Sequence, residues 1–139
     1  MIHRFLEHYR GAEFSWGSND CLNFINDAFL FQRGFKFEPS LPWDYENEKQ
    51  AYLMYRRFLK KKRVLSLNHL FDQRLHRVDH IPKVGSFVAI PAPSDKALGY
   101  AYGVVASHQG AFISPDGLVM MDLNPDTNLF WEIDRCHKF

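Results

Sequence analysis

The fold of this chain is decided by the stretch Phe14-Ser15-Trp16-Gly17-Ser18-Asn19-Asp20-Cys21, which leads directly into an apolar segment from Leu22 to Leu30. This segment predicts a buried central helix, with Ser18, Asn19 and Asp20 as candidate N-caps, of which Asp20 is favoured, and with Gly34 as its stop signal. Cys21 is then expected where a loop becomes a helix. Unpaired N–H groups and the helix dipole favour a thiolate there, and can lower a thiol pKa from about 8.5 to roughly 3.5–7.5. A nucleophilic cysteine has this construction.

The composition indicates one compact domain over residues 1–139. The chain is 46% hydrophobic and 16% aromatic, which is enough for one aromatic-rich core. Its formal net charge of +1 gives no whole-protein argument for nucleic acid or an anionic membrane. Two distant cysteines, Cys21 and Cys136, make no disulfide framework, and no stretch reaches the roughly 20 apolar residues of a membrane span. We therefore expect synthesis in the cytoplasm and no membrane span.

Helical patterns fill the first half of the chain, and strand patterns fill the second. Beyond the central helix, helices are predicted over Ile2–Tyr9, Glu46–Arg63 and Ser66–Leu75. The inward-facing residues of the long helix are expected to be Leu53, Met54, Phe58 and Leu59. Five β-rich runs between turn signals follow, at Val84–Ile90, Gly99–Ser107, Gly110–Ile113, Leu118–Leu123 and Leu129–Ile133. This order predicts an α+β fold, with N-terminal helices followed by a small antiparallel β-meander.

Motifs at both ends of the chain resemble a known family. An aromatic-x-Trp-Gly-x-x-Asp-Cys motif that opens a helix, followed by helices and a strand over Val84–Ile90, resembles the NlpC-type cell-wall endopeptidases, a branch of the papain-like cysteine hydrolases. The later segments Ala97–Gly103 and Ala111–Leu118, with a last strand containing Trp131, are similar to a small phage-encoded branch found among tail genes. The resemblance covers the chain from Phe14 to about Ile133, and it implies a papain-like fold.

The resemblance implies a cysteine without its usual base. In the family, the cysteine attacks an amide of the peptidoglycan stem peptide, and a histidine two residues before a glycine on the second strand takes its proton. Here the glycine is Gly99, and Ala97 occupies the position of the histidine. The third residue of the site, which orients the histidine, is matched by Ser114. General-base assistance typically raises the reaction rate by about 10²–10⁴-fold. The replacement of the histidine by Ala97 therefore argues against a working peptidase.

Other histidines offer weaker alternatives. His108 could act as an unexpected base, but the turn signals around it predict an exposed hairpin residue. His69 and His76, on neighbouring turns of the predicted fourth helix, could approach a metal together with Asp72. A helix surface of mixed charge explains these residues equally well. We therefore predict no metal and no cofactor.

Cys21 and its neighbours also have a purely structural explanation. A cysteine at the start of a buried helix often fills a gap as a small apolar residue. Asp20 is expected to cap the helix, and its negative charge partly opposes a thiolate next door. Trp16 is expected to cover the helix end, beside a turn made by Gly17. These roles persist in a chain that has lost catalysis.

A basic cluster lies in the second half of the long predicted helix. It comprises Arg56, Arg57, Lys60, Lys61, Lys62 and Arg63. These cations could form the hydrated face of a helix C-terminus, whose dipole they complement and whose acidic start balances them. They could also bind an acidic protein partner, or neutralise the phosphates of nucleic acid. We favour the hydrated face, then the acidic partner, and nucleic acid ranks last because the whole chain is nearly neutral.

We therefore expect a non-catalytic structural component of a phage or phage-like tail tip, located in the virion tail and in contact with other tail-tip, hub or baseplate proteins. The candidate binding residues are Trp16, Asp20, Arg56, Arg57, Lys60 and Lys61. The alternative is a murein endopeptidase that cuts host peptidoglycan during infection, with Cys21 as nucleophile and His108 as base. A tail-assembly helper that is absent from the finished particle is the third possibility.

Overall fold

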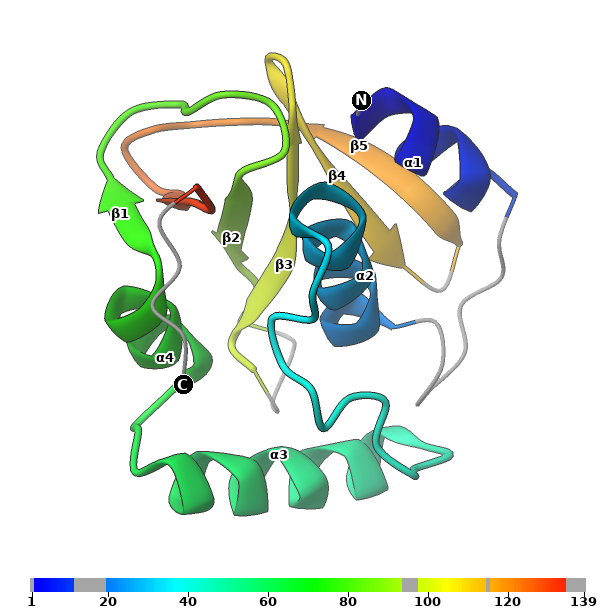
Figure 1. Cartoon of the computed structure of the whole chain (residues 1–139), viewed down its shortest axis with the longest axis vertical. Helices are drawn as coiled ribbons and strands as arrows, with labels where there is room; N and C mark the ends of the chain where they lie inside the picture. Colours follow the sequence, from blue (N-terminus) through cyan, green and yellow to red (C-terminus); the bar gives the residue numbers. More distant parts are fainter. Residues whose placement is uncertain (1, 12–19, 94–97, 115, 135–139) are drawn as a thin grey trace.

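The computed structural model describes residues 2–11, 20–93, 98–114 and 116–134, which form an α+β fold (Figure 1). The four helices in these residues are α1 (Ile2–Tyr9), α2 (Cys21–Arg33), α3 (Glu48–Lys62) and α4 (Leu67–Arg74). The six strands in them are β1 (His76–Val78), β2 (Phe87–Pro91), β3 (Tyr100–Ala106), β4 (Gln109–Ser114), β5 (Gly117–Asp122) and β6 (Leu129–Glu132). The predicted order of N-terminal helices followed by a β-meander is confirmed.

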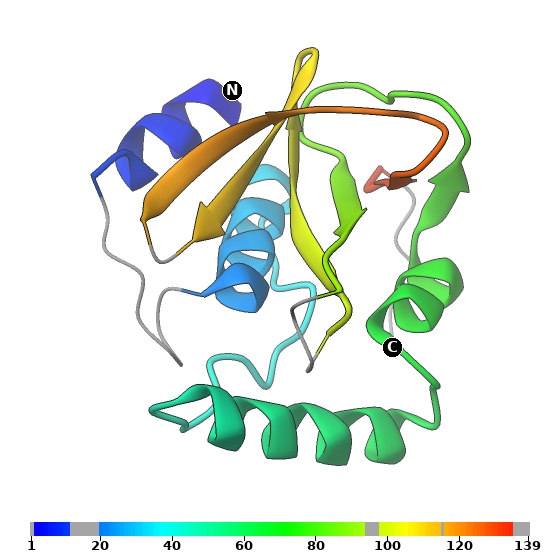
Figure 2. The same cartoon turned by 180° about the vertical axis from the view of Figure 1, so that it is seen from behind.

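The strands form one antiparallel sheet in the order β1-β6-β2-β3-β4-β5. Strands β2 to β5 follow one another as a meander, and β6 returns to lie between β1 and β2. α2 lies against one face of the sheet, whereas α3 lies apart from it, beyond the lower end of α2 in both views (Figure 1 and Figure 2). None of the helices described has the length and apolar character needed to cross a bilayer.

The short strand β1 corrects the expectation that His76 lies on a helix. α4 ends at Arg74, and Leu75 has the extended dihedral angles φ −120° and ψ 172°. The segment His76–Val78 then pairs with the segment Phe130–Glu132 of β6. Local helical spacing could not indicate this strand, because its partner lies far away in the sequence.

The main core lies between the helices and the sheet, and aromatic rings fill its centre. Phe71 of α4 is completely buried, and its ring centroid lies 5.1 to 5.5 Å from the centroids of four other aromatic rings. These rings belong to Phe37, Phe87, Tyr102 and Trp131. A smaller cluster forms on the opposite face because side chains alternate along each strand. Its buried members are Val88, Val105, Phe112 and Phe130.

Both predicted ends of α2 are confirmed. The side chain of Asp20 accepts a hydrogen bond from the N–H of Asn23 at 3.1 Å, as an N-cap does. Gly34 adopts the left-handed φ of 82°, and its N–H donates to the carbonyl of Leu30 at 2.8 Å. The predicted burial of Leu30, the last residue of the apolar segment, is wrong, since this residue is 38% exposed. The rest of the described chain covers this end of α2 only in part, and the neighbouring Phe31 is exposed as well.

α3 packs a narrower face than the sequence predicts. Phe58 and Leu59 are buried as expected, Tyr55 is buried with them, and Met54 is half-buried. The expected inward position of Leu53 is wrong, because its side chain is 49% exposed. A helix turns by about 100° per residue, which places Leu53 roughly opposite the buried face. Only one side of this helix is covered by the rest of the described chain.

Glu38, in the connection between α2 and α3, joins three helices. Its side chain is 5% exposed, and Oε1 lies 3.4 Å from Nη1 of Arg74 in α4 and 3.8 Å from Nζ of Lys62 in α3. Its other carboxylate oxygen, Oε2, accepts hydrogen bonds from the N–H and the hydroxyl of Ser40. The main chain of Glu38 exchanges two hydrogen bonds with the side-chain amide of Asn26 in α2. One residue therefore fixes the positions of α2, α3 and α4.

The environment of Glu38 favours its charged form. Burial opposes the charge, but the hydrogen bonds from Ser40 and the charges of Lys62 and Arg74 outweigh it and lower the pKa of the carboxyl below its ordinary value of 4.5. Because the pKa is lower in the folded state, the ionised carboxylate stabilises the fold above the unfolded-state pKa. This contribution is lost as the pH falls through the folded-state pKa.

Glu38→Gln is expected to lower the free energy of unfolding near neutral pH by about 2–4 kcal/mol, because it removes the charge that faces the buried guanidinium of Arg74. The difference from the native protein should shrink as the pH falls below 4.5. Denaturant unfolding at a series of pH values measures both effects. Glu7→Gln, in the exposed pair with Arg10, is the matched control and should change stability by less than about 0.5 kcal/mol. A difference that is constant with pH would contradict this role for Glu38.

Candidate functional site

Cys21 is the first residue of α2, and it lies half-buried against the main core. The N-terminal end of α2 and the start of β3 both lie on the side of the sheet that is turned toward α3 (Figure 1 and Figure 2). This is the edge where the resemblance places a catalytic site. Two residues expected there, Trp16 and Ala97, lie outside the described residues.

Both carboxylate oxygens of Asp20, the residue before Cys21, accept hydrogen bonds from other groups of the protein. Asp20 is 3% exposed, and its Oδ1 accepts hydrogen bonds from the N–H of Asn23 at 3.1 Å and from its side-chain amide at 3.0 Å. Its Oδ2 accepts a hydrogen bond from the hydroxyl of Tyr45. Its expected role as helix cap is thus confirmed. A carboxylate held one residue away also disfavours negative charge on the sulfur of Cys21.

Tyr9, which packs against Phe24 of α2, is not equipped to accept a proton. The hydroxyl of Tyr9 donates to Oδ2 of Asp27 at 2.6 Å. Burial, this hydrogen bond and the charges of Asp27 and Asp20 together raise the pKa of Tyr9 well above its usual value. Tyr9 therefore stays neutral and serves as a hydrogen-bond donor.

Tyrosines also occupy the side of β3 that faces the helices. Alternation along the strand directs Tyr100 and Tyr102 toward the main core, and Ala101 toward the smaller cluster. The hydroxyl of Tyr102 donates to Oδ1 of Asn68 at 2.6 Å, which ties β3 to α4. Ser114 ends β4, where its hydroxyl donates to the carbonyl of Gly117 and accepts from the N–H of Asp116, both at 3.1 Å. Ser114 therefore builds a turn.

His108 lies at the opposite end of the molecule from Cys21. It is exposed in the turn between β3 and β4, as the turn signals predict. This hairpin tip projects beyond the C-terminal end of α2, whereas Cys21 is at the N-terminal end (Figure 1 and Figure 2). A helix of 13 residues is about 20 Å long. His108 is therefore too far away to take a proton from Cys21 in this structure.

The residues weighed as metal ligands have other partners. Nδ1 of His69 accepts a hydrogen bond from the N–H of Leu65 at 3.1 Å. Asp72 accepts a hydrogen bond from Nε1 of Trp131 at 2.8 Å and pairs with Arg77 at 3.3 Å. His76 lies on β1, as described above. Within the described ranges, no group of three or more His, Cys, Asp or Glu side chains is arranged to hold a metal ion.

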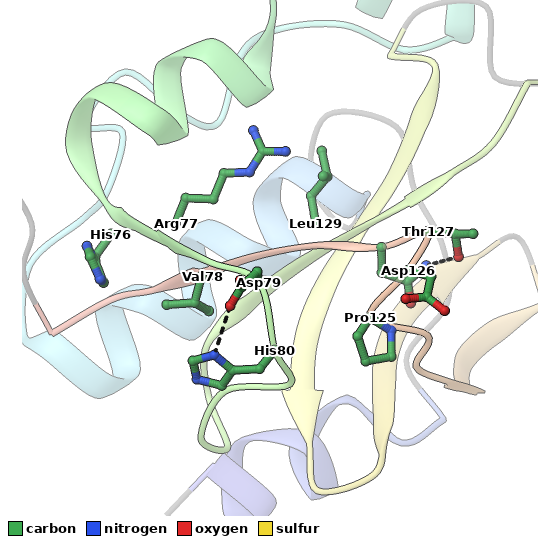
Figure 3. Close-up of a pocket in the computed structure, with 10 residues that line it drawn as sticks. His76, Arg77, Val78, Asp79, His80, Pro125, Asp126, Thr127 and Leu129 are labelled. Carbon is green, nitrogen blue, oxygen red and sulfur yellow. Dashed lines mark hydrogen bonds and ion pairs between the residues drawn. The ribbon is translucent and has the colours of Figure 1, made fainter.

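A polar groove of about 630 Å³ lies at the β1 edge of the sheet. Figure 3 shows His80 and Asp79 on one side of it, and Pro125, Asp126 and Thr127 on the other. Nδ1 of His80 lies 3.4 Å from Oδ1 of Asp79. The sequence indicates Pro125 and Asp126 only as turn residues. The groove itself could not be predicted, because β1 and its pairing with β6 were not.

The basic cluster lies on α3, and its members do not all face the same way. Arg56, Arg57, Lys60 and Lys61 are exposed, and no carboxylate of the described residues lies within 4 Å of them to form an ion pair. Lys62 points toward the body of the protein, where it pairs with Glu38. The cluster thus divides into one structural lysine and an outer charged face.

Comparison with known proteins identifies a family. The family described as "Domain of unknown function (DUF6950)" matches residues 1–133. Neither the curated proteins nor the solved structures contain a match to this chain.

Asp20→Asn is expected to raise the rate at which iodoacetamide alkylates Cys21 by about 3- to 10-fold, because it removes the adjacent negative charge while Asn still caps the helix. The rate is measured by mass spectrometry near neutral pH, in a Cys136→Ser background that leaves one thiol. Asp122→Asn, on exposed β5, is the control and should leave the rate unchanged. Equal rates for Asp20→Asn and the native residue would show that the Asp20 charge does not restrain the thiol.

Proposed function

The chain belongs to the DUF6950 family, and we propose that it is a non-catalytic structural component of a phage or phage-like tail tip, built on a scaffold related to the NlpC-type hydrolases. The description of this family names no activity, so the proposal rests on the resemblance to the NlpC-type hydrolases and on the residue at the position of their histidine. Fold alone does not dictate a role.

One feature of the sequence carries the proposal, namely that Ala97 stands at the position that matches the family's histidine. The sequence has no histidine between His80 and His108. The core-facing positions at the start of β3 are occupied by Tyr100 and Tyr102. In the NlpC-type family, acyl transfer by the thiol depends on a histidine base with a residue that orients it, and Ala97 stands at the position that matches this histidine.

The retained Cys21 motif has a use that is independent of catalysis. Asp20 caps α2 and binds Tyr45, while Cys21 packs on the main core. Loss of a cap costs about 1 kcal/mol, so selection for folding alone maintains this segment.

A tail component also needs surfaces that contact neighbours. α3 presents an outer basic face, and β5 is an edge strand on which Met120 and Met121 are 44% and 45% exposed. An edge strand offers unpaired main-chain groups to another protein. We infer that other tail proteins cover these surfaces, that the protein resides in the virion tail, and that peptidoglycan is a possible contact.

The second candidate function is a cysteine murein endopeptidase. It is favoured by one observation, the position of Cys21 at the N-terminus of a well-formed helix. This function requires a proton acceptor other than His108, because His108 lies at the far end of the molecule. The two functions make opposite predictions for purified protein.

Incubation of the purified protein with peptidoglycan is expected to release no muropeptides beyond those released by a Cys21→Ala variant, because Ala97 stands at the position that matches the family's general base. Liquid chromatography with mass spectrometry measures the products, and an active NlpC-type endopeptidase is the positive control. His108→Ala is the second comparison and should behave like the native protein. Release that disappears in Cys21→Ala would establish the endopeptidase and overturn the structural role.

The protein is expected in purified phage or phage-like particles of a strain that produces it, at a fixed ratio to the other tail proteins. Quantitative mass spectrometry of gradient-purified particles measures this ratio. A major capsid protein serves as the internal standard. If the protein is present in the lysate but absent from the particles, it is an assembly helper and not a structural component.

A further inference from the structure

The outer face of α3 is cationic with an apolar centre. Because a helix turns by about 100° per residue, four cations lie within about 60° of Leu53, on the side opposite the buried residues of α3. They are Lys49, Arg56, Arg57 and Lys60. Leu53 itself is 49% exposed and lies among them. This outer face is the surface of α3 that points away from the rest of the protein.

This arrangement is unlike an ordinary hydrated helix face. Hydrated faces normally intersperse both signs of charge, and like charges spaced i,i+4 destabilise a helix. Arg56 and Lys60 have this spacing, and so do Arg57 and Lys61. Glu48 is the sole acidic residue of α3, and it lies in the first turn. The helix therefore keeps an electrostatic repulsion that a salt-bridged sequence would avoid.

One of these cations, Arg56, contacts the aromatic side chain of Tyr52. The guanidinium carbon of Arg56 lies 5.8 Å from the ring centroid of Tyr52, and Nη1 lies 3.4 Å from the Tyr52 hydroxyl. Tyr52 is 36% exposed. The contact orders the Arg56 side chain without neutralising its charge. An anionic partner then meets a partly preorganised donor.

The near-neutral total charge conceals a strong separation of charge. Residues 48–63 contain seven of the 17 Lys and Arg residues of the chain but one of its 16 Asp and Glu residues. This segment therefore has a formal charge of +6, and the remainder of the chain has −5. A surface of one sign attracts a partner of the other sign and orients it on approach.

We propose that the outer face of α3, made of Lys49, Leu53, Arg56, Arg57 and Lys60, binds an acidic, amphipathic segment of a partner protein. This inference names the partner chemistry for the docking role proposed above and rests on that role. The cations receive carboxylates, and Leu53 with the ring of Tyr52 receives an apolar side chain. The exposed leucine favours a protein over nucleic acid, because a phosphate backbone offers no apolar contact at that position. Two exposed apolar side chains are also few for a helix that inserts into a lipid surface.

The test measures binding of a fluorescently labelled synthetic helical peptide, with glutamates spaced i,i+4 and one central leucine, by fluorescence anisotropy at physiological ionic strength. The native protein is expected to bind it. Arg57→Glu/Lys60→Glu should weaken binding at least about 10-fold, and Leu53→Ser at least about 3-fold. Duplex DNA and phosphatidylglycerol vesicles are measured in parallel, and binding to both should be weaker and insensitive to Leu53→Ser.

A matched control reverses two charges on another element. Arg4→Glu/Arg10→Glu, at exposed positions in α1 and directly after it, makes the same change in net charge and should alter peptide binding less than about twofold. Circular dichroism and thermal unfolding establish that all variants fold. Arg57→Glu/Lys60→Glu removes the i,i+4 repulsions, so its Tm should equal or exceed that of the native protein.

Several outcomes would overturn the inference. These are the absence of peptide binding to the native protein, an equal loss in the α1 control, or tighter binding to DNA or vesicles than to the peptide. The particle measurement fails separately from this one. If the protein is present in particles but does not bind the peptide, only the proposed acidic partner is rejected. If it binds the peptide but is absent from particles, the proposed role as a tail component is rejected.

Discussion

The buried carboxylate of Glu38 is the constraint on which the arrangement of the helices depends. Its charge is paired with Arg74, and its main chain is bonded to Asn26. A buried charge is costly unless it is paired and hydrogen-bonded, so α2, α4 and the connection between α2 and α3 must meet in one geometry to satisfy it. The aromatic core around Phe71 supplies most of the apolar burial but is less directional. Glu38 selects the one arrangement in which every partner is in place.

The connection between α2 and α3 also sets the orientation of α3 and the surroundings of Cys21. Phe37 enters the core, Glu38 holds α3 through Lys62, and Tyr45 donates to the cap of α2 beside Cys21. The orientation of α3 and the environment of the thiol are therefore set by a segment with no regular secondary structure. A change in this segment acts on two sites at once, although it lies in neither. The side of α3 that carries Lys62 is used for anchoring, so the remaining cations face outward.

The sequence predicted what local interactions determine. The caps Asp20, Gly34 and Ser66 are recognised from neighbouring residues, and the helix ends that they specify are observed. Strands β2 to β6 follow from β-rich runs between turn signals. Features that depend on distant partners were missed, namely strand β1, the hub at Glu38 and the bond from Tyr45 to Asp20. For the site, Cys21 and its cap could be predicted, whereas what faces them could not, because that depends on the register and the faces of β3.

The treatment of charge shows why a total is a poor guide to binding. A net charge of +1 ranks nucleic acid and anionic surfaces low for the whole chain, but this total averages over charges that lie far apart on the protein. Charges are screened within about 8 Å at physiological ionic strength, which is less than the length of α3. A partner that contacts α3 therefore meets the local charge of that helix, and the acidic residues elsewhere are largely invisible to it. Since α3 lies apart from the sheet, a partner on the outer face of this helix does not contact the strands (Figure 1).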